Sequence, residues 1–133
     1  MRRLLLALSL TLGSAPARAQ LAPVERRDFL RSVRVYIKAH QENGVFELHD
    51  DVLDREWFLK LIHLYRERVA ARADGLTFTC ADFQQADGAH KVDVDFYARK
   101  KAGAWVVEKT AIHRVDGQAR FLYNERNEPV PVE

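Results

Sequence analysis

The sequence predicts a small α+β domain in which one N-terminal helix precedes a series of antiparallel strands. Two patterns indicate this class. Apolar residues recur at three- and four-residue steps early in the chain, and later they alternate with polar residues. Tight-turn sequences separate the alternating segments, which is typical of hairpins.

The N-terminus has the form of a secretory signal peptide. A pair of arginines precedes the apolar run 4–12, and Ala-Arg-Ala at 17–19 resembles a cleavage site. The run is too short to span a membrane, which takes about 20 apolar residues, and no later segment is long and apolar enough either. A buried N-terminal helix is the alternative. We expect residues 1–19 to be removed on export, so that a periplasmic or secreted protein starts near Gln20.

The remaining length suits one domain, predicted at 20–123, followed by a polar, proline-bearing and flexible tail at 124–133. The only cysteine, Cys80, cannot form an internal disulfide. We expect it to be buried; a reactive thiol or pairing with a second copy in a homodimer are the alternatives. The net charge of +2 includes three arginines of the signal peptide, so the mature domain is close to neutral. A nucleic-acid partner therefore has little electrostatic support.

The helix is predicted over residues 23–41, where a proline suits the first turn and Asn-Gly at 43–44 marks the end. Arginines along it could form a binding stripe, but a solvated helix face is the simpler interpretation. The connection at 45–55 contains HDDVLD. Its histidine and aspartates could be metal ligands, although such clusters more often mark turns.

Strands are predicted at 76–84, 91–99, 105–115 and 118–123, because apolar and polar residues alternate there between turn sequences. The segment 56–68 is open to two interpretations. Its polar residues recur at helical steps, yet apolar residues lie on both sides, as in a buried strand.

Regular hairpins with four-residue loops at 86–89 and 100–103 would gather acidic side chains on one face of the sheet. This register pairs Asp82 with Asp93 and places the apolar residues on the opposite face. The predicted acidic face contains Cys80, Asp82, Asp93, Asp95 and Glu108. Crowded carboxylates destabilise one another, and their pKa values rise.

Three interpretations of this face are open: a solvated surface with ion pairs, a ligand- or protein-binding face, and a catalytic or metal site. No spacing typical of a zinc site, a phosphate loop or a nucleophile elbow occurs, so no metal and no cofactor is predicted. His113, in the strand before the last hairpin, is a further candidate. A single strand histidine is more often structural.

The pieces FTCADF, VDVDF and IHRVDGQARFLY resemble small secreted bacterial proteins of the cystatin-like or NTF2-like α+β type. These pieces belong to a run, residues 57–123, that covers about half of the mature chain or slightly more. The resemblance implies one long N-terminal helix packed on a curled four- or five-stranded antiparallel sheet, and a strand at 56–68. The resemblance implies no catalytic residues, and the Q-x-V-x-G motif of true cystatins is absent.

Together these observations favour an exported, non-enzymatic binding or interaction domain, whose partner is an exported protein or a small ligand. The alternatives are an NTF2-like pocket enzyme that uses a buried aspartate near His113 as base, and a metal-binding module. A deep apolar pocket holding a carboxylate between helix and sheet would favour the enzyme. A filled core beside an open acidic face would favour binding.

Overall fold

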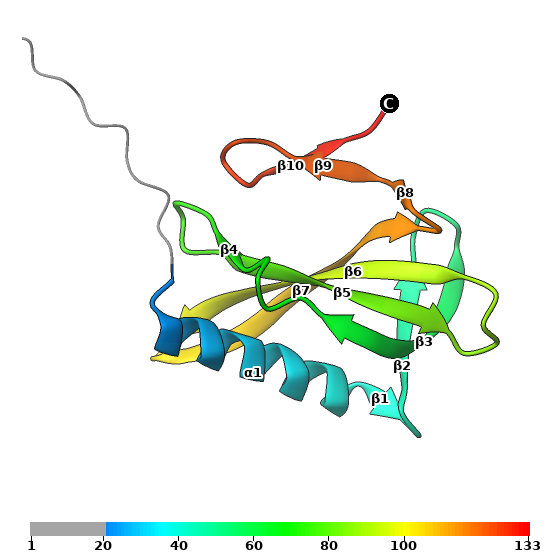
Figure 1. Ribbon diagram of the computed structural model, residues 1–133, viewed down its shortest axis with the longest axis horizontal. Helices are drawn as coiled ribbons and strands as arrows, with labels where there is room; N and C mark the ends of the chain where they lie inside the picture. The colour runs from blue at the N-terminus through cyan, green and yellow to red at the C-terminus, as the bar shows by residue number, and fades with distance from the viewer. Residues whose placement is uncertain (1–20) are drawn as a thin grey trace, which may run out of the picture.

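The structure is a computed structural model that describes residues 21–133; the predicted signal peptide at 1–19 lies outside the described residues. One helix, α1 (Pro23–Ala39), packs on one face of an eight-stranded antiparallel sheet, and a short C-terminal hairpin lies on the other side (Figure 1). The strands are β1 (Gln41–Glu42), β2 (Val45–Asp50), β3 (Arg55–Leu64), β4 (Ala70–Ala71), β5 (Thr77–Gln85), β6 (Lys91–Lys101), β7 (Ala104–Val115), β8 (Gln118–Ala119), β9 (Phe121–Tyr123) and β10 (Pro129–Pro131). The sheet order is β1-β2-β3-β5-β6-β7-β8, with β4 paired to β5.

The predicted fold class is wrong in its proportions. Residues 21–133 are mostly sheet, with eight strands in the main sheet instead of four or five, and the single helix among them is short at 17 residues. The segment expected to be a connection at 45–55 contains strand β2, which pairs with β3. Its alternating residues were too few to stand out beside the aspartate-rich turn that follows. The strand at 56–68 is confirmed as β3.

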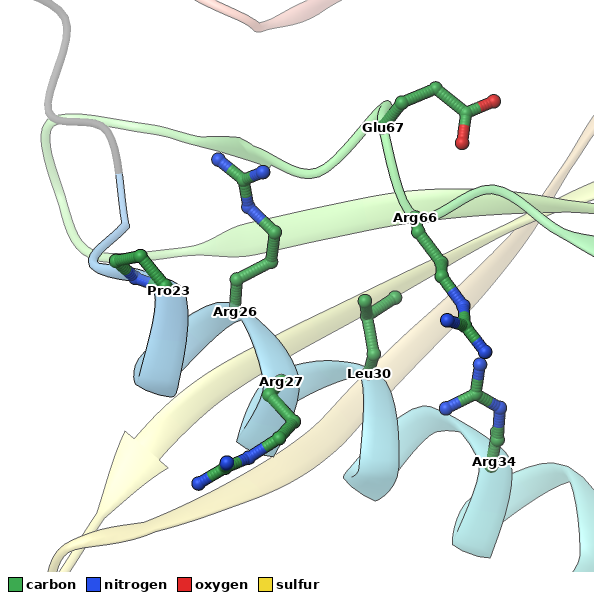
Figure 2. Close-up of a pocket in the computed structure, with 7 residues that line it drawn as sticks. All are labelled: Pro23, Arg26, Arg27, Leu30, Arg34, Arg66 and Glu67. Atoms are coloured by element: carbon green, nitrogen blue, oxygen red, sulfur yellow. The ribbon is translucent and has the colours of Figure 1, made fainter.

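Helix α1 forms because its sequence suits both its ends and its two faces. Pro23 occupies the first turn together with the acidic Glu25, and Lys38 lies in the last turn, as the helix dipole favours. The buried face carries Phe29, Leu30, Val33 and Ile37. Arginines on the solvent side line an open groove (Figure 2).

The middle of the space between α1 and the sheet is filled by side chains, and an open groove of about 450 Å³ lies at its edge between α1 and β7. Phe96 of β6 is fully buried and lies near the rings of Tyr36, Phe46 and Phe83, with centroid separations of 6.0–6.2 Å. Its cluster includes Phe29, Val33, Ile37, Trp57, Leu59, Val92 and Val94. The core is therefore solid.

The register of the first long hairpin is confirmed, and that of the second is wrong. Between β5 and β6, Asp82 faces Asp93 and Cys80 faces Asp95. Between β6 and β7, Asp95 faces Ala111 and two bulges shift the pairing. The turn there holds only two residues, Ala102 and Gly103, at φ 50° and 80°, and paired positive φ values are what a two-residue hairpin turn requires.

The C-terminal segment covers the sheet face opposite α1. Residues 124–133, expected to form a flexible tail, contain strand β10, which pairs with β9. As a result β6 is buried on both faces, so that Asp95 and Tyr97 are 1% and 3% exposed. Of the three interpretations of the acidic face, a fully solvated surface therefore does not apply to Asp95.

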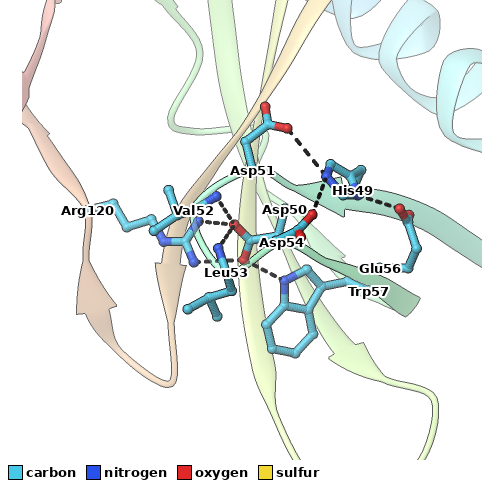
Figure 3. Close-up of polar contacts among 9 residues, drawn as sticks. All are labelled: His49, Asp50, Asp51, Val52, Leu53, Asp54, Glu56, Trp57 and Arg120. Carbon is cyan, nitrogen blue, oxygen red and sulfur yellow. Dashed lines mark hydrogen bonds and ion pairs between the residues drawn. The ribbon is translucent and has the colours of Figure 1, made fainter.

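An ion pair attaches the chain after β8 to the start of the β2–β3 turn (Figure 3). Arg120 donates two hydrogen bonds of 2.8 Å to the two carboxylate oxygens of Asp50. The indole Nε1 of Trp57 donates another at 2.8 Å. Asp50 is 1% exposed and the Arg120 side chain is 22% exposed, so a buried carboxylate meets a partly buried guanidinium group. Within residues 21–133, no helix has the length and apolar character needed to cross a membrane.

Candidate functional site

A pocket of about 140 Å³ opens on the sheet face opposite α1, next to β9. It has room for a few water molecules or one compact organic group. Its lining comes from five parts of the chain: Arg68, Phe78, Cys80, Asp93, Asp95, His113, Arg114 and Tyr123. Most of these side chains are polar or charged, so the pocket suits a polar occupant.

Asp95 is the buried centre of this pocket. Its Oδ2 accepts a hydrogen bond of 2.6 Å from the hydroxyl of Tyr123, which in turn contacts the hydroxyl of Tyr97. Its Oδ1 is buried and has no hydrogen-bond partner among the described residues. An unsatisfied buried carboxylate oxygen costs stability, and few buried polar atoms in folded proteins lack a partner.

The ring of His113 is held between Asp95 and two aromatic rings. Its Nδ1 lies 3.2 Å from Asp95 Oδ2, and its plane stacks on Phe121 at 4.5 Å between centroids. Negative charge on Asp95 favours a proton on Nδ1, which leaves the lone pair on Nε2 in the neutral ring. Nε2 is buried and also lacks a partner in residues 21–133. The pocket lining therefore contains two unsatisfied buried polar atoms, and in this tautomer both are acceptors.

The thiol of Cys80 and the phenol groups of Tyr97 and Tyr123, in or next to the pocket, are held in their neutral forms. Burial, reinforced by the charge of Asp95, raises the pKa of the Cys80 thiol to about 11. Burial raises the pKa of Tyr97 to about 12, and burial with the charge of Asp95 raises that of Tyr123 further still. A protonated thiol is a weak nucleophile, so Cys80 is not prepared for covalent catalysis.

Asp93 lies at the edge of the pocket in contact with Asp82. Burial and the neighbouring charge of Asp82 raise the pKa of Asp93 to about 6, against the lowering effects of Arg114 and His113. The carboxylate of Asp82 accepts a hydrogen bond of 2.6 Å from the Tyr65 hydroxyl. The pair therefore holds a proton in mildly acidic solution.

Replacing Asp93 with asparagine should stabilise the protein by about 1–2 kcal/mol near neutral pH and change little near pH 3. The folded pKa of about 6 exceeds the ordinary aspartate pKa of 3.8. The contribution of Asp93 to stability is therefore fully present below about pH 3.8, and it is lost as the pH rises through 6. The expected stabilisation is smaller than the change in the pKa of Asp93 alone would give, because Asp93 is partly exposed and water screens its charge. Urea melts at both pH values measure it.

The exposed turn variant Asp87→Asn serves as the control and should show no such pH dependence. The stabilisation by Asp93→Asn should be equal in calcium and in a chelator. A calcium-dependent loss of stability would instead indicate a metal site at this carboxylate pair. Among the residues that the structure describes, no group of three or more His, Cys, Asp or Glu side chains is arranged to hold a metal.

The structure brings together four of the five side chains predicted for the acidic face: Cys80, Asp82, Asp93 and Asp95. Glu108 is separate from them. It lies 3.2 Å from Lys101 and 3.5 Å from Arg99, because the tight turn and the bulges shift β7. His113, predicted independently, contacts Asp95.

Four pocket residues were missed: Arg68, Phe78, Arg114 and Tyr123. Tyr123 follows the Asp-Gly hairpin signal, but no local pattern indicates that its strand folds over the face of β6. Arg68 comes from the connection after β3, whose conformation the sequence left open. Arg114 could have been predicted as a pocket residue, because it is next to the candidate His113 in the same strand.

The fold and the pocket define a small, mostly antiparallel-sheet protein with one helix and a buried carboxylate–histidine–tyrosine cluster. No protein family, no curated protein and no solved structure matches this chain. The resemblance to cystatin-like or NTF2-like proteins stays a prediction.

Proposed function

We propose that the protein is an exported, non-enzymatic binding domain whose pocket takes a compact polar ligand. The observation that carries this proposal is the pair of buried, unsatisfied acceptors, Asp95 Oδ1 and His113 Nε2, in the lining of one small pocket. A ligand that donates hydrogen bonds to both atoms would offset the cost of leaving them unpaired. Export rests on the signal peptide predicted at 1–19.

The chemistry of the lining indicates a ligand with a nitrogen donor group. Two acceptors, one of them an oxygen of the buried Asp95 carboxyl group, suit an ammonium or amidinium head, which presents several N–H donors and no acceptor. Arg68 and Arg114 line the same pocket, so a second, oxygen-bearing end of the ligand would find a cationic partner. The volume of about 140 Å³ limits the ligand to a few heavy atoms.

Binding is favoured over catalysis because the core between α1 and the sheet is filled and the thiol of Cys80 is protonated. One observation supports an acid–base enzyme as the second candidate. A histidine whose Nδ1 faces a buried aspartate, and whose Nε2 is free, is an arrangement that general bases use.

The proposal is tested by titrating the ¹⁵N-labelled protein with methylammonium, ethanolamine, guanidinium and glycine, with acetate as the matched acid. We expect at least one nitrogen donor to shift the His113 ring nitrogen resonances and to raise the melting temperature, as binding to the folded state requires. Asp95→Asn should abolish both effects, whereas Asp87→Asn should retain them.

Binding that persists unchanged in folded Asp95→Asn would contradict the proposal, as would the absence of any shift with all four nitrogen compounds. If Asp95→Asn does not fold, His113→Gln provides the second variant, since it removes the Nε2 acceptor. Conversion of the compound during the titration would favour the enzyme.

A further inference from the structure

An open groove of about 490 Å³ lies along the N-terminal half of α1, far in sequence from the pocket residues of β6 and β7. Figure 2 shows its lining, which is dominated by arginines: Pro23, Arg26, Arg27, Leu30, Arg34, Arg66 and Glu67. The groove is a second concave surface whose charge differs from that of the Asp95 pocket.

Helical spacing and one loop residue produce this concentration of charge. Arg26, Leu30 and Arg34 are four residues apart and therefore lie on one side of α1. Leu30, 5% exposed, is buried between the two arginines. Arg66, from the segment after β3, extends across the groove so that its guanidinium group points toward that of Arg34 (Figure 2).

Three of the four arginines in the lining lack carboxylate partners among the described residues. Within residues 21–133, Arg26, Arg34 and Arg66 make no ion pair, whereas Arg27 lies 3.6 Å from Asp28. The only carboxylate in the lining is that of Glu67, which points away from the arginines in Figure 2. Two guanidinium groups that face each other without an anion repel one another, and an anion between them would remove that cost.

We propose that this groove binds a phosphate or sulfate group. Guanidinium groups present paired N–H donors that match the oxygens of such anions in two-pronged hydrogen bonds. The two facing guanidinium groups of Arg34 and Arg66 offer more donors than the two oxygens of a carboxylate can accept, and a tetrahedral oxyanion has more acceptor oxygens. The volume exceeds that of the bare anion, and Pro23 and Leu30 provide apolar surface for the rest of the molecule.

The probe is inorganic phosphate, with sulfate in parallel, added to the ¹⁵N-labelled protein at constant ionic strength set with sodium chloride. We expect saturable shifts of the backbone amides around residues 26–34 and 66. Arg34→Gln and Arg66→Gln should each weaken the affinity at least about tenfold. Arg31→Gln is the matched control, since it removes the same charge from the exposed side of the same helix, and should change the affinity less than about twofold.

The source of the oxyanion is distinguished by a second arm with vesicles. Binding to phosphatidylglycerol vesicles, but not to phosphatidylcholine vesicles, and its loss in Arg34→Gln would assign the group to a lipid headgroup. Saturation by free phosphate or a soluble phosphomonoester with no vesicle binding would assign it to a soluble ligand.

Equal weakening by Arg31→Gln and Arg34→Gln would overturn the proposal, because the effect would then reflect net charge and an adventitious ion only. Shifts that do not saturate would overturn it as well. The outcome is separable from that of the nitrogen-donor pocket. Asp95→Asn should leave phosphate binding unchanged, and Arg34→Gln should leave the pocket titration unchanged.

Discussion

Replacing Arg120 with alanine is expected to destabilise the protein by about 3–5 kcal/mol, the range for removing one partner of a buried ion pair. The side chain of Asp50 is 0% exposed, and Arg120 supplies two of its hydrogen bonds. Without the guanidinium group a charged carboxylate would stay buried with only Trp57 and two backbone N–H groups as donors. The chain beyond β8 would also lose its attachment to the β2–β3 turn.

The matched control is Arg126→Ala, which removes an arginine from an exposed pair with Glu128. The Arg126 side chain is 80% exposed, so the loss should stay under about 1 kcal/mol. Urea unfolding curves measure both variants. If Arg120→Ala costs no more than Arg126→Ala, then Asp50 and Arg120 are not a buried pair in solution.

The same pair also predicts a pH dependence. Hydrogen bonds from Arg120 hold the pKa of Asp50 well below its ordinary value. A carboxyl group with a lowered folded pKa contributes stability above its unfolded pKa and loses it as the pH falls toward the folded value. Arg120→Ala should therefore cost much more near neutral pH than in strong acid.

Replacing Phe96 with alanine should destabilise the protein by about 3–5 kcal/mol, as is usual for a fully buried phenylalanine. Phe96 is 0% exposed and lies among Tyr36, Phe46 and Phe83. The rings around it belong to α1, β2 and β5, so they cannot collapse into the cavity without moving the helix against the sheet.

Phe58→Ala is the control, since Phe58 is 47% exposed on β3. It should change the free energy of unfolding by about 0.5 kcal/mol or less. Urea melts with unchanged m-values would attribute the difference to the folded state. A larger loss for Phe58 than for Phe96 would mean that the two sheet faces are interchanged.

Features that depend on neighbouring residues were predictable from the sequence. The helical period around Phe29 and Val33 predicted α1, and alternation with the turn at 86–89 predicted the hairpin of β5 and β6. From that hairpin the contacts of Asp82 with Asp93 and of Cys80 with Asp95 followed correctly. Strand β2 was missed because its alternation is short and an aspartate-rich turn follows it.

The second hairpin shows where local pattern stops being sufficient. A loop of two residues in place of four, together with two bulges, moved Glu108 away from the predicted acidic face. Bulges insert single residues that alternation cannot locate, because the side-chain period resumes on either side of them. The wrong register removed only Glu108 from the predicted acidic face, and the other four residues of that face still lie together.

The sequence by itself determined a domain of one helix and antiparallel strands, the first long hairpin and its acidic residues, and the candidacy of His113. Only the tertiary structure decided that these residues form a pocket. The alternation along β6 placed Asp95 on the face opposite the apolar side chains and left open whether that face is solvated, and Tyr123, 28 residues beyond Asp95, folds over it and donates a hydrogen bond to Asp95. The physical reason is that alternation records which side chains share a face of a strand. Whether that face meets water or a distant strand depends on contacts between remote parts of the chain.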